Sequence, residues 1–228
     1  MLCGSGFPLS REWRFLQTSQ TAGLSIHSAA FWSGFHQVWK VDLVVDSEIR
    51  EAVSDLLNGI GEDPARDGLR DTPARVARMY SELFSGLDKD PESVLTTTFA
   101  EPYDEMIVLR DVPFFSMCEH HLLPFFGSAD IGYIPGDRIV GLSKLARALE
   151  ILSRRPQLQE RLTFEVADAV EKALDPLGVA VRIQAEHLCM TMRGIKKPGS
   201  KMVTTVTRGA FRDNSATRAE FFDSVARG

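Results

Sequence analysis

The stretch FGSADIGYIPGD, residues 126–137, decides the fold because it carries a strand pattern that ends in a clear turn. Side chains alternate in character from Phe126 to Ile134, which predicts a β-strand. The following Pro-Gly-Asp, residues 135–137, has the composition of a turn. Residues 105–111 have a second strand pattern, so the sequence predicts two strands in succession.

Two helices and two further strands are predicted after this turn. The first helix covers residues 143–152, with Ser143 as its capping residue. The second helix is predicted to open at Pro156, because proline is favoured at the first helical position. Alternating patterns at 179–189 and 202–211 predict the last two strands.

Two more helices precede the strands. Apolar residues recur at helical spacing between residues 46 and 60. Thr72-Pro73 predicts the start of the next helix, with a capping hydroxyl before a proline, and Gly86 is expected to close it. The complete order is helix, helix, strand, strand, helix, helix, strand, strand. This order is typical of an α+β domain with an antiparallel sheet.

Residues 1–40 differ from the rest of the chain. They contain a single acidic residue, Glu12, and no sustained helical or strand period. They have neither the basic start nor the apolar core of a secretory signal peptide. We therefore expect a poorly ordered N-terminal tail, or an extension from an upstream start codon.

Composition restricts the class of protein. With 228 residues, 44% of them hydrophobic and 25% charged, the chain is typical of a soluble globular protein. A net charge of −5 argues against a general nucleic-acid binder, and no apolar run reaches the ~20 residues needed to span a membrane. Three cysteines form no disulfide framework, which favours a reducing compartment such as the cytoplasm.

The net charge conceals an uneven distribution. Residues 41–135 contain 19 acidic and seven basic residues. Residues 182–212 contain one acidic residue, Glu186, and seven basic ones. A basic block inside an acidic protein indicates a local anionic ligand, although a solvated strand face would have the same composition.

The segment SMCEHH, residues 116–121, has the composition of a metal site. Two residues separate Cys118 from His121, which lets one turn place both on a single zinc ion. Cys189 is the remaining candidate ligand in the body of the chain. Because His187 lies two residues earlier in a predicted strand, it would face the same side as Cys189.

Cys118, His121 and Cys189 would be three ligands suited to Zn²⁺ and would leave a fourth position for water, as in catalytic sites. His120 and His187 could then transfer protons, because imidazole titrates near neutral pH. Other interpretations stay open. The cysteines could be buried core thiols or a disulfide, and a pair of adjacent histidines is often a surface feature.

Three further positions could bind a nucleotide. Ser143, Lys144 and Arg147 lie at the start of a predicted helix, where free N–H groups favour an anion. Glu160 could accept two N–H bonds from a guanine-type edge, and Arg193 could bring a guanidinium to the same cleft. Each also has a simpler interpretation. Ser143 could be a capping serine beside the solvated cations Lys144 and Arg147. Glu160 could be a carboxylate on a helix surface, and Arg193 an arginine in a turn.

Several blocks together resemble the signature motifs of GTP cyclohydrolase I, in the same order over about residues 45–225. They are Cys118-Glu119-His120-His121, Gly141-Leu142-Ser143-Lys144, Arg155-Pro156-Gln157-x-Gln159-Glu160-Arg161-Leu162 and His187-x-Cys189-x-x-x-Arg193-Gly194. The upstream Thr72-Pro73-x-Arg75-Val76-Ala77-x-Met79-Tyr80 block fits the same family. Independent motifs at consistent spacing make the resemblance specific.

The resemblance implies the tunnelling fold, an antiparallel four-stranded sheet with two helices on one face, preceded by a helical N-terminal region. On this basis residues 41–98 form the helical region and residues 99–228 the catalytic domain, after the tail at residues 1–40. The family also assembles as a homodecamer of two face-to-face pentamers with active sites between subunits.

The implied reaction converts GTP and water to 7,8-dihydroneopterin triphosphate and formate, the first step of pterin and tetrahydrofolate biosynthesis. One Zn²⁺ per subunit would be held by Cys118, His121 and Cys189, with its water attacking C8 of the purine. The implied partners are GTP and further copies of the chain, with no nucleic acid and no membrane.

The resemblance also implies roles for the remaining site residues. His120 would transfer protons at the purine N7 and the formyl intermediate, and His187 would assist as a second proton-transfer group. Ser143 would act near the ribose ring oxygen. Glu160, with help around Gln159, would anchor the guanine edge. The triphosphate would be bound by the cations Arg75, Arg78, Lys144, Arg147 and Arg193.

Two other functions stay open. A related tunnelling-fold enzyme acting on another purine or pterin would share the geometry of the site, although the complete Cys-Glu-His-His and His-x-Cys set argues against it. A non-catalytic zinc-binding assembly module would need a fourth protein ligand, and Cys3 is the one cysteine left over for that role.

Overall fold

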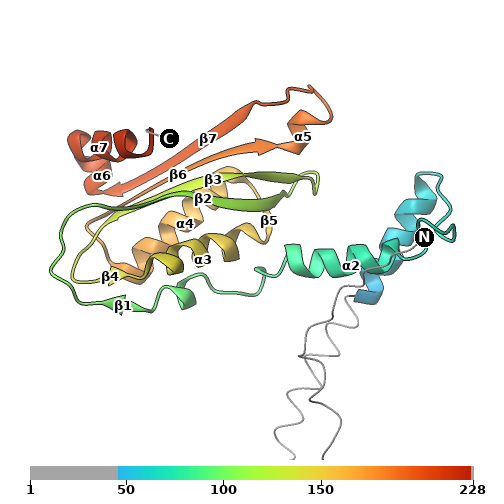
Figure 1. Ribbon diagram of the computed structural model, residues 1–228, viewed down its shortest axis with the longest axis horizontal. Helices are drawn as coiled ribbons and strands as arrows, with labels where there is room; N and C mark the ends of the chain where they lie inside the picture. The colour runs from blue at the N-terminus through green and yellow to red at the C-terminus, as the bar shows by residue number, and fades with distance from the viewer. Residues whose placement is uncertain (1–45, 227–228) are drawn as a thin grey trace, which may run out of the picture. The chain divides into compact units, whose positions relative to one another are not determined.

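Four long strands form the central sheet of the computed structural model, which describes residues 46–226 (Figure 1). They follow one another in the order β2-β3-β6-β7, and each neighbouring pair is antiparallel. The predicted α+β class and the predicted antiparallel sheet of four strands are therefore confirmed. The N-terminal tail predicted at residues 1–40 lies outside the described residues. The strands are β2 (Ile107–Cys118), β3 (Pro124–Ile134), β6 (Gly178–His187) and β7 (Lys201–Gly209).

A fifth, very short strand extends this sheet beyond the prediction. β5 (Pro156–Gln157) pairs in parallel with the end of β2, placing Gln157 opposite Cys118. The prediction that Pro156 opens a helix is wrong, because the helix begins at Gln159. Proline is tolerated here since β5 is an edge strand. A separate two-stranded sheet joins β1 (Thr98–Phe99) to β4 (Ile139–Val140).

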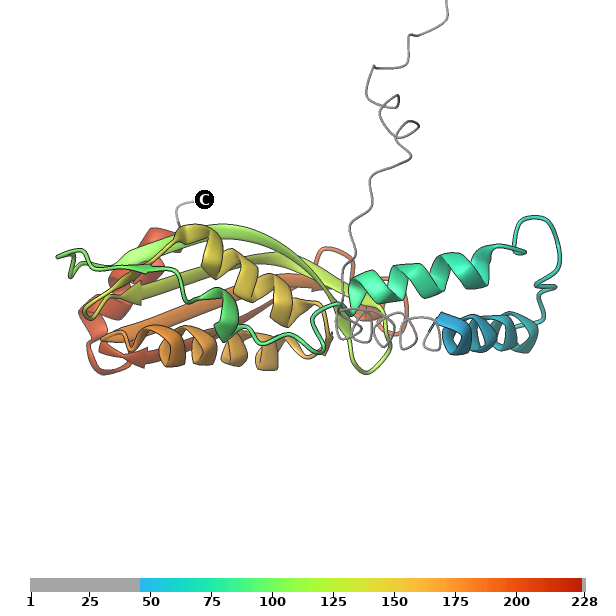
Figure 2. The ribbon, with the colours of Figure 1, turned by 90° about the horizontal axis from the view of Figure 1, so that it is seen from below.

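Two helices cover one face of the sheet, as predicted. α3 (Leu142–Ser153) and α4 (Gln159–Leu174) lie side by side on it (Figure 2). Their apolar stripes and the alternate residues of the strands form the main core, because each element buries one face. Core side chains include Leu145, Leu149, Leu162, Val166 and Val170 from the helices and Ile131, Tyr133, Val181 and Ile183 from the strands.

The opposite face is partly covered by two C-terminal helices that were not predicted from the sequence. α6 (Ala210–Asp213) and α7 (Ser215–Ala226) follow β7, and α7 lies across the sheet from α3 and α4 (Figure 1). Phe211 and Phe221 are buried in a second apolar cluster with Ala180 of β6. The sheet therefore has apolar side chains on both faces at this end.

The two upstream helices are present, but their caps differ from the prediction. Residues 46–59 are helical, and α2 covers Thr72–Leu83. Asp71 holds the capping position of α2 but makes no capping hydrogen bond with its side chain, and Thr72 is the first helical residue. Likewise Gly141 precedes α3, so Ser143 lies inside that helix rather than capping it.

Gly86 does not close α2, which ends three residues earlier at Leu83. Instead the Gly86 N–H donates to the carbonyl of Arg154 at 3.0 Å, and Arg155 Nε donates to the Gly86 carbonyl at 2.9 Å. These bonds join the segment after α2 to the end of α3. A 3₁₀ turn, η2 (Glu92–Val94), follows in the same segment.

The predicted strand at 179–189 is too long at its C-terminal end. β6 stops at His187, and α5 (Leu188–Thr191) carries Cys189 on a short helical turn. The expectation that His187 and Cys189 share one side of a strand is therefore wrong. Within residues 46–226, no helix combines the length and the apolar character that a membrane span requires.

Candidate metal centre

Cys118 occupies the last position of β2, where the chain reverses direction. Its N–H donates to the carbonyl of Leu123 at 2.9 Å, and its own carbonyl accepts from His121 at 3.3 Å and from Leu122 at 2.8 Å. Leu122 has a positive φ of 49°, which lets the turn close tightly. The turn thus places the His121 ring beside the Cys118 thiol.

Cys189 reaches the same place from a distant part of the sequence. β6 pairs with β3 in a register that sets His187 opposite Phe125, close to the start of β3. α5 follows β6 immediately and therefore lies beside the turn that carries Cys118. The ligand atoms of Cys118, His121 and Cys189 all lie within 4.8 Å of one another.

The donor set fits a tetrahedral zinc ion. Distances of about 2.3 Å from zinc to sulfur and about 2.0 Å from zinc to nitrogen require ligand atoms roughly 3.5–3.8 Å apart, a spacing compatible with this cluster. Both cysteines are free thiols, so the disulfide alternative is not what the structure contains. Burial raises the pKa of the Cys189 thiol, and the nearby Cys118 raises it further. A bound cation would relieve this penalty on the thiolate.

His187 lies next to this cluster and is held on two sides. Its ring stacks on Phe125 with centroids 4.7 Å apart and planes 3° apart. Its Nε2 lies 2.8 Å from Oε1 of Gln159. Burial lowers the pKa of His187, while the carboxylate of Glu160 acts in the opposite direction. The imidazole is therefore favoured in its neutral form.

Glu119 and Arg161 brace the turn between the candidate ligands. Two bonds join the Arg161 guanidinium to the Glu119 carboxylate, at 2.5 and 3.0 Å. Hydrogen bonding to Arg161 is the main cause of the lowered pKa of Glu119. The Glu119 N–H also donates to the carbonyl of Gln157 at 3.0 Å. Neither side chain has a role predicted from the sequence, and 42 positions separate them.

His120 and Glu160 are exposed beside the cluster. The His120 and His121 rings lie at 77° to each other with centroids 6.2 Å apart. Glu160 stands in the first turn of α4, and its charge acts on His187. Arg193 is exposed and close enough for its charge to lower the pKa of the Cys189 thiol, against the larger effect of burial.

The Gln159 side chain is oriented into the protein rather than toward solvent. It is 1% exposed, and its amide nitrogen donates to the chain itself, including the carbonyls of Ile183 and Met202 at 3.1 Å each. Its amide oxygen faces His187. The amide that was expected to help anchor guanine is therefore already fully engaged.

Apart from Arg193, the residues predicted to contact the triphosphate or the ribose are not brought to the cluster within one chain. Ser143, Lys144 and Arg147 lie near the start of α3, whereas the cluster lies near its end, where Gln157 donates to Leu152. Ten residues of helix from Ser143 onward correspond to about 15 Å. Arg75 and Arg78 are exposed on α2, and Arg75 donates to Asp71 at 3.1 Å.

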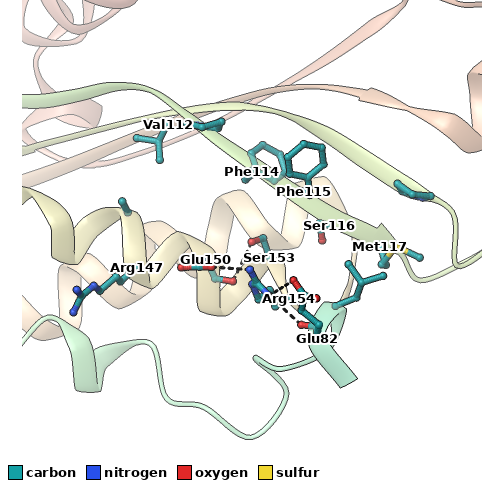
Figure 3. Close-up of a pocket in the computed structure, with 14 residues that line it drawn as sticks. Glu82, Val112, Phe114, Phe115, Ser116, Met117, Arg147, Glu150, Ser153 and Arg154 are labelled. Atoms are coloured by element: carbon teal, nitrogen blue, oxygen red, sulfur yellow. Dashed lines mark hydrogen bonds and ion pairs between the residues drawn. The ribbon is translucent and has the colours of Figure 1, made fainter. Parts of the chain in front are cut away.

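A cavity of about 590 Å³ lies between β2, α3 and the end of α2 (Figure 3). Phe114 and Phe115 contribute to its lining, and at its edge Arg154 donates to Glu150 at 2.8 Å and to the Glu82 carbonyl at 3.1 Å. None of the three candidate ligands lines it. This recess is therefore beside the candidate metal centre and separate from it.

The fold and the cluster together define an α+β protein with a candidate metal centre at one end of its sheet. A sequence profile of the family GTP cyclohydrolase I matches residues 49–226. The chain belongs to the GTP cyclohydrolase I family, and it is an enzyme of that family. The resemblance noted from the motifs is thereby confirmed.

Bacterial relatives agree with this assignment. A protein named GTP cyclohydrolase 1 from Halalkalibacterium halodurans is 58% identical over 183 residues, which cover 79% of this chain and 97% of the relative. A protein of the same name from Streptococcus mutans is 59% identical over 179 residues, covering 78% of this chain and 93% of the relative. One from Streptococcus agalactiae is 55% identical over 182 residues, with 79% and 97% covered.

Proposed function

We propose that this chain converts GTP and water to 7,8-dihydroneopterin triphosphate and formate, as a zinc-dependent hydrolase. The observation that carries the proposal is the convergence of Cys118, His121 and Cys189 within 4.8 Å, from two segments that are far apart in the sequence. Family membership supports the choice of GTP as substrate. The product would be the precursor of pterins and tetrahydrofolate.

Two thiolates and one imidazole are the donors that would hold Zn²⁺. When bound, the ion supplies Lewis-acid chemistry and brings the pKa of water close to neutrality. Among the described residues, the cluster contains three candidate protein ligands and no fourth. This count favours a catalytic site over a structural zinc site, which normally has four protein ligands.

His120 and His187 are the proposed proton-transfer residues. His187 is partly buried and has a lowered pKa, so it would be ready to accept a proton at neutral pH. His120 is exposed next to His121 and could reach a substrate that lies over the turn. Two imidazoles in different surroundings suit a reaction that must both accept and return protons.

Glu160 is the proposed anchor of the guanine edge, because its carboxylate is exposed at the start of α4 and close to His187. Arg193, near Cys189, would bind phosphate on the same side. We propose that Gln159 supports this region from within rather than contacting the base.

The remaining contacts would come from neighbouring subunits. Ser143, which would act near the ribose, lies with Lys144 and Arg147 at the end of α3 that is away from the cluster of their own chain. This placement supports active sites shared between chains. We propose a homodecamer with one zinc per subunit, built from the tunnelling-fold domain at residues 99–228 and the helical region at 41–98. The phosphate-binding cations are Arg75, Arg78, Lys144 and Arg147.

Purified protein incubated with GTP tests the proposal. Formate and a pterin that fluoresces after oxidation should both appear, and a strong zinc chelator should abolish both. Cys118→Ser should lose zinc and turnover, His120→Ala should lose turnover alone, and Cys3→Ser should behave as wild type. Equal formate release with and without zinc would contradict the proposal, as would turnover of preformed pterins in preference to GTP.

A further inference from the structure

His187 is held through one ring nitrogen by a side chain whose orientation can be worked out. Nε2 of His187 lies 2.8 Å from Oε1 of Gln159. The distance alone does not say which of the two atoms donates, because a neutral imidazole has one N–H and one lone pair. The surroundings of Gln159 decide the question.

Two backbone carbonyls fix the direction of the Gln159 amide. Its Nε2 lies 3.1 Å from the carbonyl oxygens of Ile183 and Met202, in a site where the side chain is 1% exposed. Carbonyl oxygens can only accept hydrogen bonds, so an N–H₂ group must face them. The reverse orientation would bury the Gln159 amide oxygen against both carbonyl oxygens, and neither of these can donate a hydrogen bond to it.

Two threonines complete the same pattern. Thr163 Oγ1 donates to the backbone carbonyl of Gln159 at 2.7 Å and lies 2.6 Å from Thr204 Oγ1. When the Thr163 hydroxyl donates to the Gln159 carbonyl, the Thr204 hydroxyl donates to Thr163. The Thr204 hydroxyl oxygen also lies 3.1 Å from Gln159 Nε2, so the two amide protons are shared among three acceptors. The amide orientation itself is fixed by the two carbonyls, which cannot donate.

We infer that Gln159 is a positioning residue that holds His187 in the Nε2–H tautomer, so that Nδ1 is the nitrogen that exchanges protons with the substrate. Oε1 of Gln159 can only accept, and His187 Nε2 must therefore carry the proton. Stacking on Phe125 fixes the plane of the ring in the same orientation. Within residues 46–226, Nδ1 has no hydrogen-bond partner.

The inference depends on the proposed function only where it assigns proton exchange to His187. The tautomer itself follows from the hydrogen-bond network. A measurement of the tautomer that does not depend on turnover therefore separates the inference from the proposed function. If the enzyme does not hydrolyse GTP, the tautomer can still be as inferred. If the enzyme is active, the tautomer can still prove to be the other one.

Nitrogen NMR of the zinc-loaded, full-length protein labelled with ¹⁵N-histidine tests the tautomer. Signals of His187 are assigned from their loss in His187→Gln. We expect Nε2 to appear as the protonated nitrogen, correlated with both ring carbon-bound protons, and Nδ1 as the unprotonated one. A protonated Nδ1 with an unprotonated Nε2 would overturn the inference.

Two variants separate positioning from packing. Gln159→Met keeps the approximate side-chain size but removes the acceptor, so His187 should lose its single tautomer and kcat should fall on the order of 10²-fold, with zinc content retained. Thr204→Val leaves both carbonyls facing Gln159, so the tautomer should be unchanged. An unchanged His187 spectrum in Gln159→Met would overturn the inference. If that variant does not fold, the wild-type spectrum decides alone.

Discussion

The Glu119–Arg161 pair is a side-chain contact on which we expect metal affinity to depend. It holds the turn between Cys118 and His121 through two hydrogen bonds. Removing a contact that orients a metal ligand, without itself binding the metal, typically weakens metal affinity by about 10–100-fold. Arg161→Met should therefore weaken zinc binding by a factor in this range, as measured by competition with a chromophoric chelator.

Arg70→Met is the matched control for this prediction. Arg70 also pairs with a carboxylate, Asp67, at 2.8 Å, but both side chains are largely exposed. Zinc affinity should be unaffected in this control. Equal zinc affinity in both variants and in the wild type would show that the pair does not support the ligand turn.

Sequence spacing could predict Cys118 and His121 as neighbours because both lie in one turn. Cys189 had to be inferred from its residue type, and the structure brings it to them through the pairing of β6 with β3. Arg161 could not be linked to Glu119, since nothing local connects positions 42 apart. The burial of Gln159 was also hidden, because a motif gives residue types but not the direction of a side chain.

At the scale of elements, the close approach of the Gly86 segment to the end of α3 gives a stability prediction. A Cβ at this position would lie 2.0 Å from the carbonyl oxygen of Ile151. Gly86→Ala should therefore lower the free energy of unfolding by about 1–3 kcal/mol, because backbone must move to relieve the clash. Thermal or urea unfolding would measure the change.

Gly59→Ala provides the contrast, since a Cβ there would have no atom within 4 Å. This substitution should leave stability unchanged or raise it by about 0.4–1 kcal/mol. Loss of stability in Gly59→Ala of the same size as in Gly86→Ala would show that the clash is not the cause.

The link between α4 and β7 predicts a dependence of stability on pH. Asp168 accepts from Lys172 at 2.7 Å and from Arg208 of β7 at 3.4 Å, and these contacts lower its pKa, Lys172 most strongly. A lowered pKa means that the ionised carboxylate stabilises the folded state above its ordinary pKa of about 3.9 and loses this effect as pH falls through the lowered value.

Asp168→Asn should accordingly lower the free energy of unfolding by about 0.5–1 kcal/mol at pH 7, a modest effect because the pair is partly solvated. The difference from wild type should disappear in acid. Urea unfolding at several pH values measures it, with Asp67→Asn as an exposed control. A deficit that persists in acid would indicate lost packing rather than lost charge.

Periodicity predicted the helices and strands well where one face is buried, as in α3, α4 and the central strands. It failed at their ends. Proline is favoured at the start of a helix, but Pro156 instead lies in β5, because this short strand pairs with the edge of β2. The alternation continues past His187, but the chain turns helical at α5. Such boundaries depend on contacts between distant segments, which a local pattern does not contain.

At the scale of the whole molecule, shared active sites predict that two inactive variants can complement each other. Cys118→Ser lacks a metal ligand, and Lys144→Ala lacks a phosphate contact from the distant end of α3. Each should be inactive alone, because every site contains the defect. Unfolded and refolded together, they should regain partial activity, since some sites combine an intact cluster from one chain with an intact Lys144 from another.

Cys118→Ser mixed with Cys189→Ser is the control for complementation. Both substitutions fall in one cluster of one chain, so no mixed assembly can contain an intact site. Activity recovered in this control, or none recovered with Lys144→Ala, would contradict sharing between chains. Light scattering of the wild type should show a decamer.

X-ray absorption at the zinc edge of the purified enzyme examines the metal centre itself. In the wild type, two sulfur atoms and one imidazole nitrogen from the protein should surround the ion. Any zinc that the Cys189→Ser variant retains should have one sulfur neighbour fewer. A wild-type spectrum with no sulfur, or with three or more, would show that Cys118, His121 and Cys189 do not form the site.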